Sequence, residues 1–284
     1  MTVEQNMYIS SRSTEQLKSQ AEALKMPYKE IGIMGGMGPA ATIDLFKGVV
    51  DETRNYITIE SDQDHLEIFI ANIPQVPDRT NFVLYDMKLR PDSAEDPFPY
   101  LVRGINKLAA AGSKFAGIPC NTAHYFVPEL QKYIDESGFD MQIINMIEET
   151  ADEVAKNFDK GAKVGILATT GTLQSGLYHT ALKKKGFEVV IPNDEEQEDE
   201  VMEAIYGTHT KVGIKLGSPI EVPRERLLRA TESLRHQGAE IVLTACTEIP
   251  LAFRQTDTDM RLINPTSVLG NKLIELAVSP KLAK

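Results

Sequence analysis

The stretch Gly112–His124, GSKFAGIPCNTAH, is repeated in the second half of the chain. Its counterpart is Gly238–Glu248, GAEIVLTACTE; in both copies a glycine ends a helical segment, a buried strand follows and a cysteine closes the strand. The cysteine follows the glycine by eight residues each time, at Cys120 and Cys246. These are the only two cysteines among 284 residues. Equivalent thiols at the ends of equivalent strands predict one site that uses both.

Strands and helices alternate along the chain, and the predicted strands are uniformly apolar. Such strands are typical of a parallel sheet in an α/β fold. The segments KEIGIMGGMGPAAT (29–42) and AKVGILATTGTLQS (162–175) both read as strand, small-residue turn and helix. We therefore predict two similar α/β halves whose strand ends share a cleft, where ligands bind in open α/β sheets.

The domain limits follow from this alternation. Residues 1–29 are predicted to be an N-terminal extension with a short helix over 13–24. Residues 30–142 together with 265–284 are assigned to the first α/β domain, and residues 143–264 to the second. A helix is expected after Pro39, with an apolar face of Ile43, Phe46, Val49 and Val50. The acidic run 193–200 is expected to be a solvated loop or helix start.

Composition excludes several classes of partner. A net charge of −11 argues against a nucleic-acid groove or an anionic membrane surface, because both need concentrated Lys and Arg. Local cations in a cleft still permit an anionic small substrate. No apolar run approaches a membrane span, and the first residues do not resemble a signal peptide. We therefore expect a cytoplasmic protein with reduced thiols. Two cysteines without CxxC spacing, and five histidines, predict no zinc site.

The glycine-rich turn GIMGGMG (32–38) invites a nucleotide interpretation. Its spacing is G-x-x-G-G-x-G, which matches neither GxGxxG nor GxxxxGK[ST]. Such a turn can direct backbone N–H groups at a carboxylate as well as at a phosphate. An anion-binding turn and a tight packing turn both remain open.

The cysteines suggest acid–base chemistry. A buried cysteine often fills space only, but two at matched positions favour a shared function. Backbone amides and a following helix start would favour the thiolate at each, and His124 and Glu248 follow closely enough to contact the thiols. Disulfide exchange normally uses adjacent thiols, whereas inversion of a stereocentre needs an acid and a base on opposite faces.

Five motifs in order carry a family resemblance: GIMGGMGP, ANIPQVPDRT, PCNTAH, AIYG followed by GIKLG, and ACTEIPL. Across residues 30–275 the chain resembles the aspartate/glutamate racemase family, in its aspartate racemase-like branch. The resemblance implies catalysis without PLP or another cofactor, an acidic amino acid as substrate, two α/β domains related by pseudo-twofold symmetry, and a homodimer.

The resemblance also implies roles for individual residues. Cys120 and Cys246 would be the paired acid and base. Arg79 would bind a carboxylate bidentately, and Lys215 would supply a second cation, with Lys211 as the competing candidate. The remaining expected substrate ligands are Asn121, Thr122 and Ala123 around the α-carboxylate, Thr247 as their equivalent, Gly38 and Asn72. Asn264 stands where family members often carry aspartate, which predicts an altered contact to the substrate ammonium or a thiol.

Several alternatives remain open at this point. A racemase of other amino acids or of hydantoins uses the same residues. A single-cysteine decarboxylase would not need both thiols. A non-catalytic binding protein for acidic amino acids and a redox thiol protein are the candidates from other classes. Neither aspartate over glutamate, nor the enantiomer on which each cysteine acts, can be read from the sequence.

Overall fold

The computed structural model describes residues 13–24, 27–89 and 93–279. Within them two four-stranded parallel sheets have the same strand order, β2-β1-β3-β4 and β6-β5-β7-β8. The strands are β1 (Ile31–Gly35), β2 (Ile68–Asn72), β3 (Phe115–Gly117), β4 (Gln142–Ile144), β5 (Lys163–Leu167), β6 (Glu188–Val190), β7 (Ile241–Thr244) and β8 (Arg261–Ile263). The predicted fold of two similar parallel α/β halves is confirmed.

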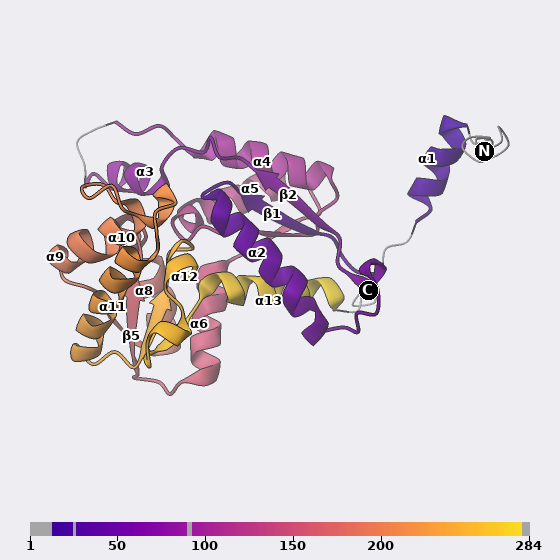
Figure 1. Ribbon diagram of the computed structural model, residues 1–284. Helices are drawn as coiled ribbons and strands as arrows, with labels where there is room; N and C mark the ends of the chain where they lie inside the picture. Colours follow the sequence, from indigo (N-terminus) through magenta and orange to yellow (C-terminus); the bar gives the residue numbers. More distant parts are fainter. Residues whose placement is uncertain (1–12, 25–26, 90–92, 280–284) are drawn as a thin grey trace, which may run out of the picture.

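Helices cover the sheets, and two of them cross between the halves (Figure 1). The first half carries α2 (Pro39–Glu52), α3 (Arg79–Asp86), α4 (Phe98–Ala110), α5 (Val127–Glu136) and α13 (Pro265–Val278); the second carries α6 (Met146–Asn157), α7 (Thr170–Gln174), α8 (Leu177–Lys185), α10 (Glu203–Tyr206), α11 (Glu221–His236) and α12 (Ile249–Ala252). α6 follows β4 but packs on α8, whereas α13 follows β8 and returns to α2 and β3.

The chain passes from the first half to the second slightly later than predicted. β4 pairs with β3 as far as Ile144, so the chain leaves the first sheet at Asn145 and not at residue 142. Asn145 and Asn264 cap α6 and α13 through their side chains, in equivalent positions after β4 and β8. The division into domains remains a prediction, and residues 280–284 lie outside the described part.

The turn after β1 depends on glycine. Gly36 has a φ of 100°, and a Cβ there would lie 2.4 Å from the backbone of Ile73. Only glycine combines this conformation with so close an approach. The glycine-rich turn is thus a tight packing turn that brings the start of α2 beside the end of β2.

The predicted apolar face of α2 is correct at Val49 but wrong at Ile43 and Phe46. The helix buries Ala41, Thr42, Leu45 and Val49, while Ile43 and Phe46 are exposed. The reason is close packing on both neighbours: Thr42 lies so near Gly35 that a Cβ there would be 2.3 Å away, and Gly270 of α13 approaches Leu45. Small side chains permit these contacts, so the larger ones face outward.

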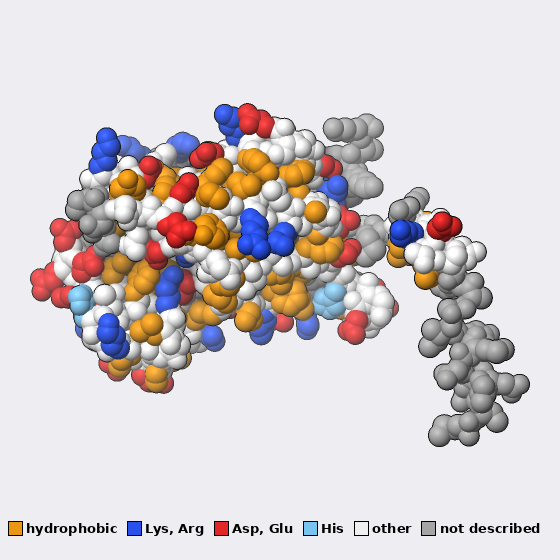
Figure 2. All heavy atoms as spheres, turned by 90° about the horizontal axis from the view of Figure 1, so that it is seen from above, with side chains coloured by type: hydrophobic (Ala, Val, Ile, Leu, Met, Phe, Trp, Pro, Cys, Tyr) orange, Lys and Arg blue, Asp and Glu red, His pale blue; other side chains and the backbone are white. Residues whose placement is uncertain are grey.

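Several other expectations can be compared with the structure. The N-terminal helix exists as α1 (Thr14–Glu22) and stands apart from the sheets (Figure 1), whereas residues 1–12 lie outside the described part. The acidic run begins a helix, α9 (Asp194–Glu196), and acidic side chains gather at this end of the molecule (Figure 2). Within the described residues, no helix combines the length and hydrophobicity that a bilayer-spanning segment needs.

Candidate active site

Both cysteines line one cavity between the two sheets. Cys120 lies three residues past β3 and Cys246 two residues past β7, just beyond the strand ends. The cavity is lined by Met37, Arg79, Thr80, Cys120, Asn121, Thr122, Thr169, Thr172, Tyr206, Lys215, Cys246, Thr247 and Glu248. Its volume of about 10 Å³ is close to the smallest that can hold one water molecule. An amino acid does not fit this closed arrangement unless the residues that line the cavity move.

Hydroxyl groups from both halves close the cavity. Thr80 on α3 donates to Thr169 at 3.2 Å. Thr122 lies 3.1 Å from Thr169 and 2.7 Å from Thr172, the latter on α7. All four side chains are buried. This network joins the two halves directly over the thiols.

Cys246 is held in its protonated form. Its thiol donates to Glu248 Oε2 at 3.1 Å. Burial first, and then the Glu248 carboxylate, raise the pKa of Cys246 well above its usual value, although Lys215 opposes them. The expectation that both thiols are favoured as thiolates is therefore wrong for Cys246, because a carboxylate faces it.

Lys215, and not Lys211, reaches the cavity. Its Nζ lies 3.6 Å from Glu248 Oε1 and 4.8 Å from the centre of the Tyr206 ring. Burial alone would lower the pKa of Lys215, but Glu248, Tyr206 and Cys246 outweigh it and raise it. Lys211 is exposed and donates to Thr208 O at 2.7 Å.

Arg79 begins α3 and lies buried against Cys120. Its Nη1 donates to the carbonyls of Val76 and Pro77, and its Nη2 donates to Met37 O. Nε has no partner among the described residues. Burial would lower the pKa of Arg79, but interaction with Cys120 outweighs it and raises the pKa. Three of the five N–H donors are thus used by backbone, which leaves Nε–H and one Nη2–H for a ligand or the sulfur.

The residues after each cysteine behave differently. The Asn121 side chain accepts from the Tyr178 hydroxyl at 2.6 Å, and its Nδ2 has no partner in the described part of the chain. That amide is a free donor on the cavity wall. The Thr247 hydroxyl, in the second half, donates to Pro119 O, in the first half, at 3.3 Å.

Four expected residues do not line the cavity. Asn72 is exposed at the end of β2, and Ala123 is buried beside the site. Gly38 caps α2, and a Cβ there would lie 3.2 Å from Glu248. Asn264 caps α13, where its Oδ1 accepts from Thr266 N at 2.9 Å, and it does not line the cavity of the two thiols.

His124 contacts the backbone of Cys120 and not its thiol. Its Nδ1 lies 2.9 Å from Cys120 O, and its Nε2 accepts from Met146 N at 3.1 Å. Nδ1 must therefore carry the proton and donate to the carbonyl. Burial lowers the pKa of His124 to about 4. A neutral histidine thus ties the Cys120 turn to the start of α6.

This histidine should make stability depend on pH. Below pH 6.5 His124 becomes protonated in the unfolded chain, whereas in the folded chain it becomes protonated only at about pH 4. We expect the free energy of unfolding to decrease by about 3 kcal/mol through this window as pH falls. Urea unfolding at several pH values would measure the slope. In His124→Gln the slope should be shallower, and identical slopes would contradict the assignment.

Lys215 is carried by a loop that Glu203 organises. The buried Glu203 carboxylate accepts from the N–H groups of His209 and Thr210, at 3.1 and 2.6 Å, and from the Thr210 hydroxyl at 2.7 Å. Burial alone would raise the pKa of Glu203, but these hydrogen bonds outweigh it and lower it to about 2. The backbones of Gly207 and Gly213 lie close together at the two ends of this loop, because a Cβ on Gly207 would lie only 2.6 Å from Gly213 N.

Replacing this carboxylate should loosen the loop. In Glu203→Gln the new amide group faces N–H donors, so we expect the free energy of unfolding to fall by about 2 kcal/mol. We also expect a higher KM for the substrate, because Lys215 loses its fixed position. The exposed Glu195→Gln on α9 is the matched control. An unchanged KM together with normal stability would show that Glu203 does not position Lys215.

Sequence reasoning missed part of this site. Tyr206 lies in the AIYG motif, from which no site role was predicted for it. Its hydroxyl donates to Asp78 Oδ2 at 3.1 Å, from the second half to the first. Thr80 follows Arg79 in the quoted VPDRT motif, whereas Thr169 and Thr172 lie in the repeated turn. The position of Thr169 and Thr172 after β5 could have indicated that they line the site, because the equivalent turn after β1 also borders the cavity.

Comparisons with known proteins agree with this architecture. The sequence model described as Asp/Glu/hydantoin racemase matches residues 34–273. The broad specificity amino-acid racemase RacX of Bacillus subtilis (strain 168) is 25% identical over 248 residues, which are 86% of this chain and 96% of RacX. An aspartate racemase of Picrophilus torridus superimposes with a TM-score of 0.67 at 27% identity, over 87% of this chain and 93% of that one. An aspartate racemase homologue from Pyrococcus horikoshii OT3 gives 0.64 at 26% identity, over 87% and 98%. The chain belongs to the Asp/Glu/hydantoin racemase family.

Proposed function

We propose that this protein racemises an acidic amino acid without PLP, with Cys120 and Cys246 as opposed acid and base. The observation that carries the proposal is that both thiols line one closed cavity together with two cations and one carboxylate. The relatives named as aspartate racemases support the reaction class. The homodimer remains a prediction from the resemblance, and the cytoplasmic location remains a prediction from the sequence.

The charges of the cavity match an acidic amino acid. Arg79 and Lys215 offer two cations for two carboxylates, and Glu248 offers one carboxylate for the ammonium. Aspartate and glutamate carry that set of charges. A neutral amino acid would bring one carboxylate instead of two to these cations, which costs binding free energy. Free donors at Arg79 and Asn121 Nδ2 are available to hold the α-carboxylate.

The two cysteines differ before the substrate arrives. The Cys246 thiol donates a hydrogen bond to Glu248, whereas Cys120 lies against the Arg79 guanidinium. A cation stabilises negative charge on a neighbouring sulfur. We propose that Cys120 acts first as the base and Cys246 first as the acid, so the enzyme first accepts the enantiomer whose α-hydrogen faces Cys120.

The reaction then needs two proton transfers. The Cys120 thiolate takes the α-proton and becomes a thiol, and the electron pair passes into the α-carboxylate as a planar carbanion. Cys246 donates its proton to the opposite face and becomes a thiolate. Preorganised donors stabilise the charge that develops on the carboxylate, in a cavity that excludes water. The enzyme ends with its protonation states exchanged, ready for the reverse direction.

The broad-specificity relative favours a wider substrate range as the second candidate. Chiral chromatography after incubation with single enantiomers tests both, without added PLP or metal. We expect aspartate or glutamate to be inverted at least about tenfold faster than alanine or lysine, since one unmatched charge costs a tenfold factor or more. Equal rates for neutral and acidic amino acids would favour the broad-specificity enzyme instead.

A further inference from the structure

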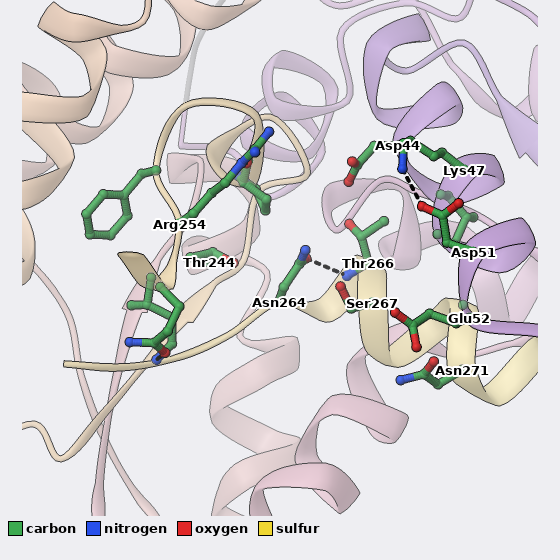
Figure 3. Close-up of a pocket in the computed structure, with 17 residues that line it drawn as sticks. Asp44, Lys47, Asp51, Glu52, Thr244, Arg254, Asn264, Thr266, Ser267 and Asn271 are labelled. Carbon is green, nitrogen blue, oxygen red and sulfur yellow. Dashed lines mark hydrogen bonds and ion pairs between the residues drawn. The ribbon is translucent and has the colours of Figure 1, made fainter. Parts of the chain in front are cut away.

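A second cavity lies between the halves, apart from the cysteines. Its volume is about 510 Å³, within the range of small-molecule sites, and it shares no lining residue with the cysteine cavity. Its walls are α2, the start of α13 and the segment after α12 (Figure 3). An occupant would therefore touch elements of both halves.

Opposite charges face one another across this cavity. Asp44 on α2 and Arg254 after α12 point toward one another from opposite walls (Figure 3). Neither makes an ion pair within 4.0 Å in the described part of the chain, although Arg254 Nε donates to Pro250 O. Burial raises the pKa of Asp44, and Arg254 opposes the shift. Both groups line the same cavity of about 510 Å³, so a ligand that carries both charges could contact each of them.

The start of α13 adds donors to the third wall. Asn264 Oδ1 accepts from Thr266 N, but the next N–H groups of a helix start have no partner within the helix. The positive end of the helix dipole favours an anion there. Thr266 is only 3% exposed, and its Oγ1 has no hydrogen-bond partner among the described residues. A buried hydroxyl without a partner beside a helix start indicates a polar occupant.

We propose that this cavity binds a basic α-amino acid. Its carboxylate lies between Arg254 and the start of α13, and its α-ammonium meets Asp44. The lining holds three carboxylates, Asp44, Asp51 and Glu52, against two cations, Lys47 and Arg254. Lys47 pairs with Asp51. Glu52 accepts a hydrogen bond from Asn55 Nδ2, but no cation among the described residues pairs with it, so its charge remains for the side-chain cation of the ligand. A lysine-like molecule satisfies every charge on the walls.

Two helices at the walls of this cavity, α2 and α12, begin close to the cysteine cavity. α2 begins at the turn beside Glu248, and α12 begins directly after Glu248. A ligand that bridges Asp44 and Arg254 would hold these two elements at a fixed separation. The site is thus placed to brace the closed arrangement of the halves.

Isothermal titration calorimetry with L-lysine tests the proposal on the full-length protein. We expect saturable binding, weakened at least about tenfold in Arg254→Ala and in Asp44→Asn, because each removes one charge-assisted contact. The exposed Arg103→Ala on α4 is the matched control and should bind normally. Absence of binding to the unmodified protein, or equal binding by all variants, would overturn the site.

Two further titrations separate this cavity from the catalytic one. L-Norleucine has the chain length of lysine without the side-chain cation, and should bind at least about tenfold more weakly. Equal binding would overturn the basic class of ligand. Saturating L-aspartate and L-glutamate should not abolish lysine binding, whereas complete competition would place lysine at the cysteines and overturn the proposal. These readouts do not depend on racemisation, so the proposed activity can fail while this site stands.

Discussion

Replacement of either cysteine by alanine is expected to abolish inversion and to leave proton exchange on one enantiomer only. The remaining cysteine, once deprotonated, can still remove the α-proton on its own face and return a deuteron from solvent. It cannot deliver one to the opposite face, where the partner thiol is missing. The exchange should be slower in Cys120→Ala, because burial and Glu248 keep Cys246 protonated. Loss of a general acid or base of this kind costs about 10²–10⁴-fold in rate. Cys120→Ala and Cys246→Ala should therefore exchange opposite enantiomers.

Proton NMR in D₂O with single enantiomers measures this exchange, and chiral chromatography follows inversion. The thiol-free double variant is the control and should do neither, since the chain has no other cysteine. If a single variant still inverts its substrate at near the unmodified rate, two opposed thiols are not required. If both variants exchange the same enantiomer, the cysteines do not face opposite sides of the α-carbon.

Lys215→Met should lower kcat/KM by about two orders of magnitude. The change removes a cation from a buried site where we propose it binds a substrate carboxylate, a contact worth up to about 3 kcal/mol. It also removes the ion pair with Glu248, the carboxylate that accepts the hydrogen bond of Cys246. Methionine keeps most of the side-chain volume, so the effect is one of charge.

Lys211→Met is the matched control, because Lys211 lies four residues earlier in the same loop and is exposed. Its kcat/KM should stay within about twofold of the unmodified protein, because Lys211 does not line the cavity and its Nζ donates only to Thr208 O among the described residues. Steady-state kinetics on aspartate and glutamate would compare the two variants. A large loss in Lys211→Met with a normal Lys215→Met would reverse the assignment.

Much of the fold could be predicted because it depends on local patterns. Apolar runs such as Ile31–Met34 can only be buried strands, and glycines such as Gly36 mark turns that exclude other residues. The repeat of these patterns predicts two halves with the same strand order. The face of α2 could not be predicted, because it depends on how closely Thr42 and Gly270 approach their neighbours, which are distant in sequence.

The site was predictable where it follows from the repeat. Cys120 and Cys246 meet because equivalent strand ends of two similar halves share a cleft. The state of Cys246 was not predictable, since it depends on the rotamer of Glu248 and on burial. The loop support from Glu203 and the hydroxyl network around Thr169 also depend on contacts between distant segments.

Deuterium incorporation during inversion tests the central claim most directly. L-Aspartate and L-glutamate would be incubated separately with the protein in D₂O, without PLP or metal, and followed by proton NMR and chiral chromatography. The two-thiol mechanism predicts that the D enantiomer appears with deuterium at its α-carbon, while the α-proton signal of the starting enantiomer is lost. Retention of the α-proton in both amino acids, with no D product, would contradict the proposed racemisation of an acidic amino acid.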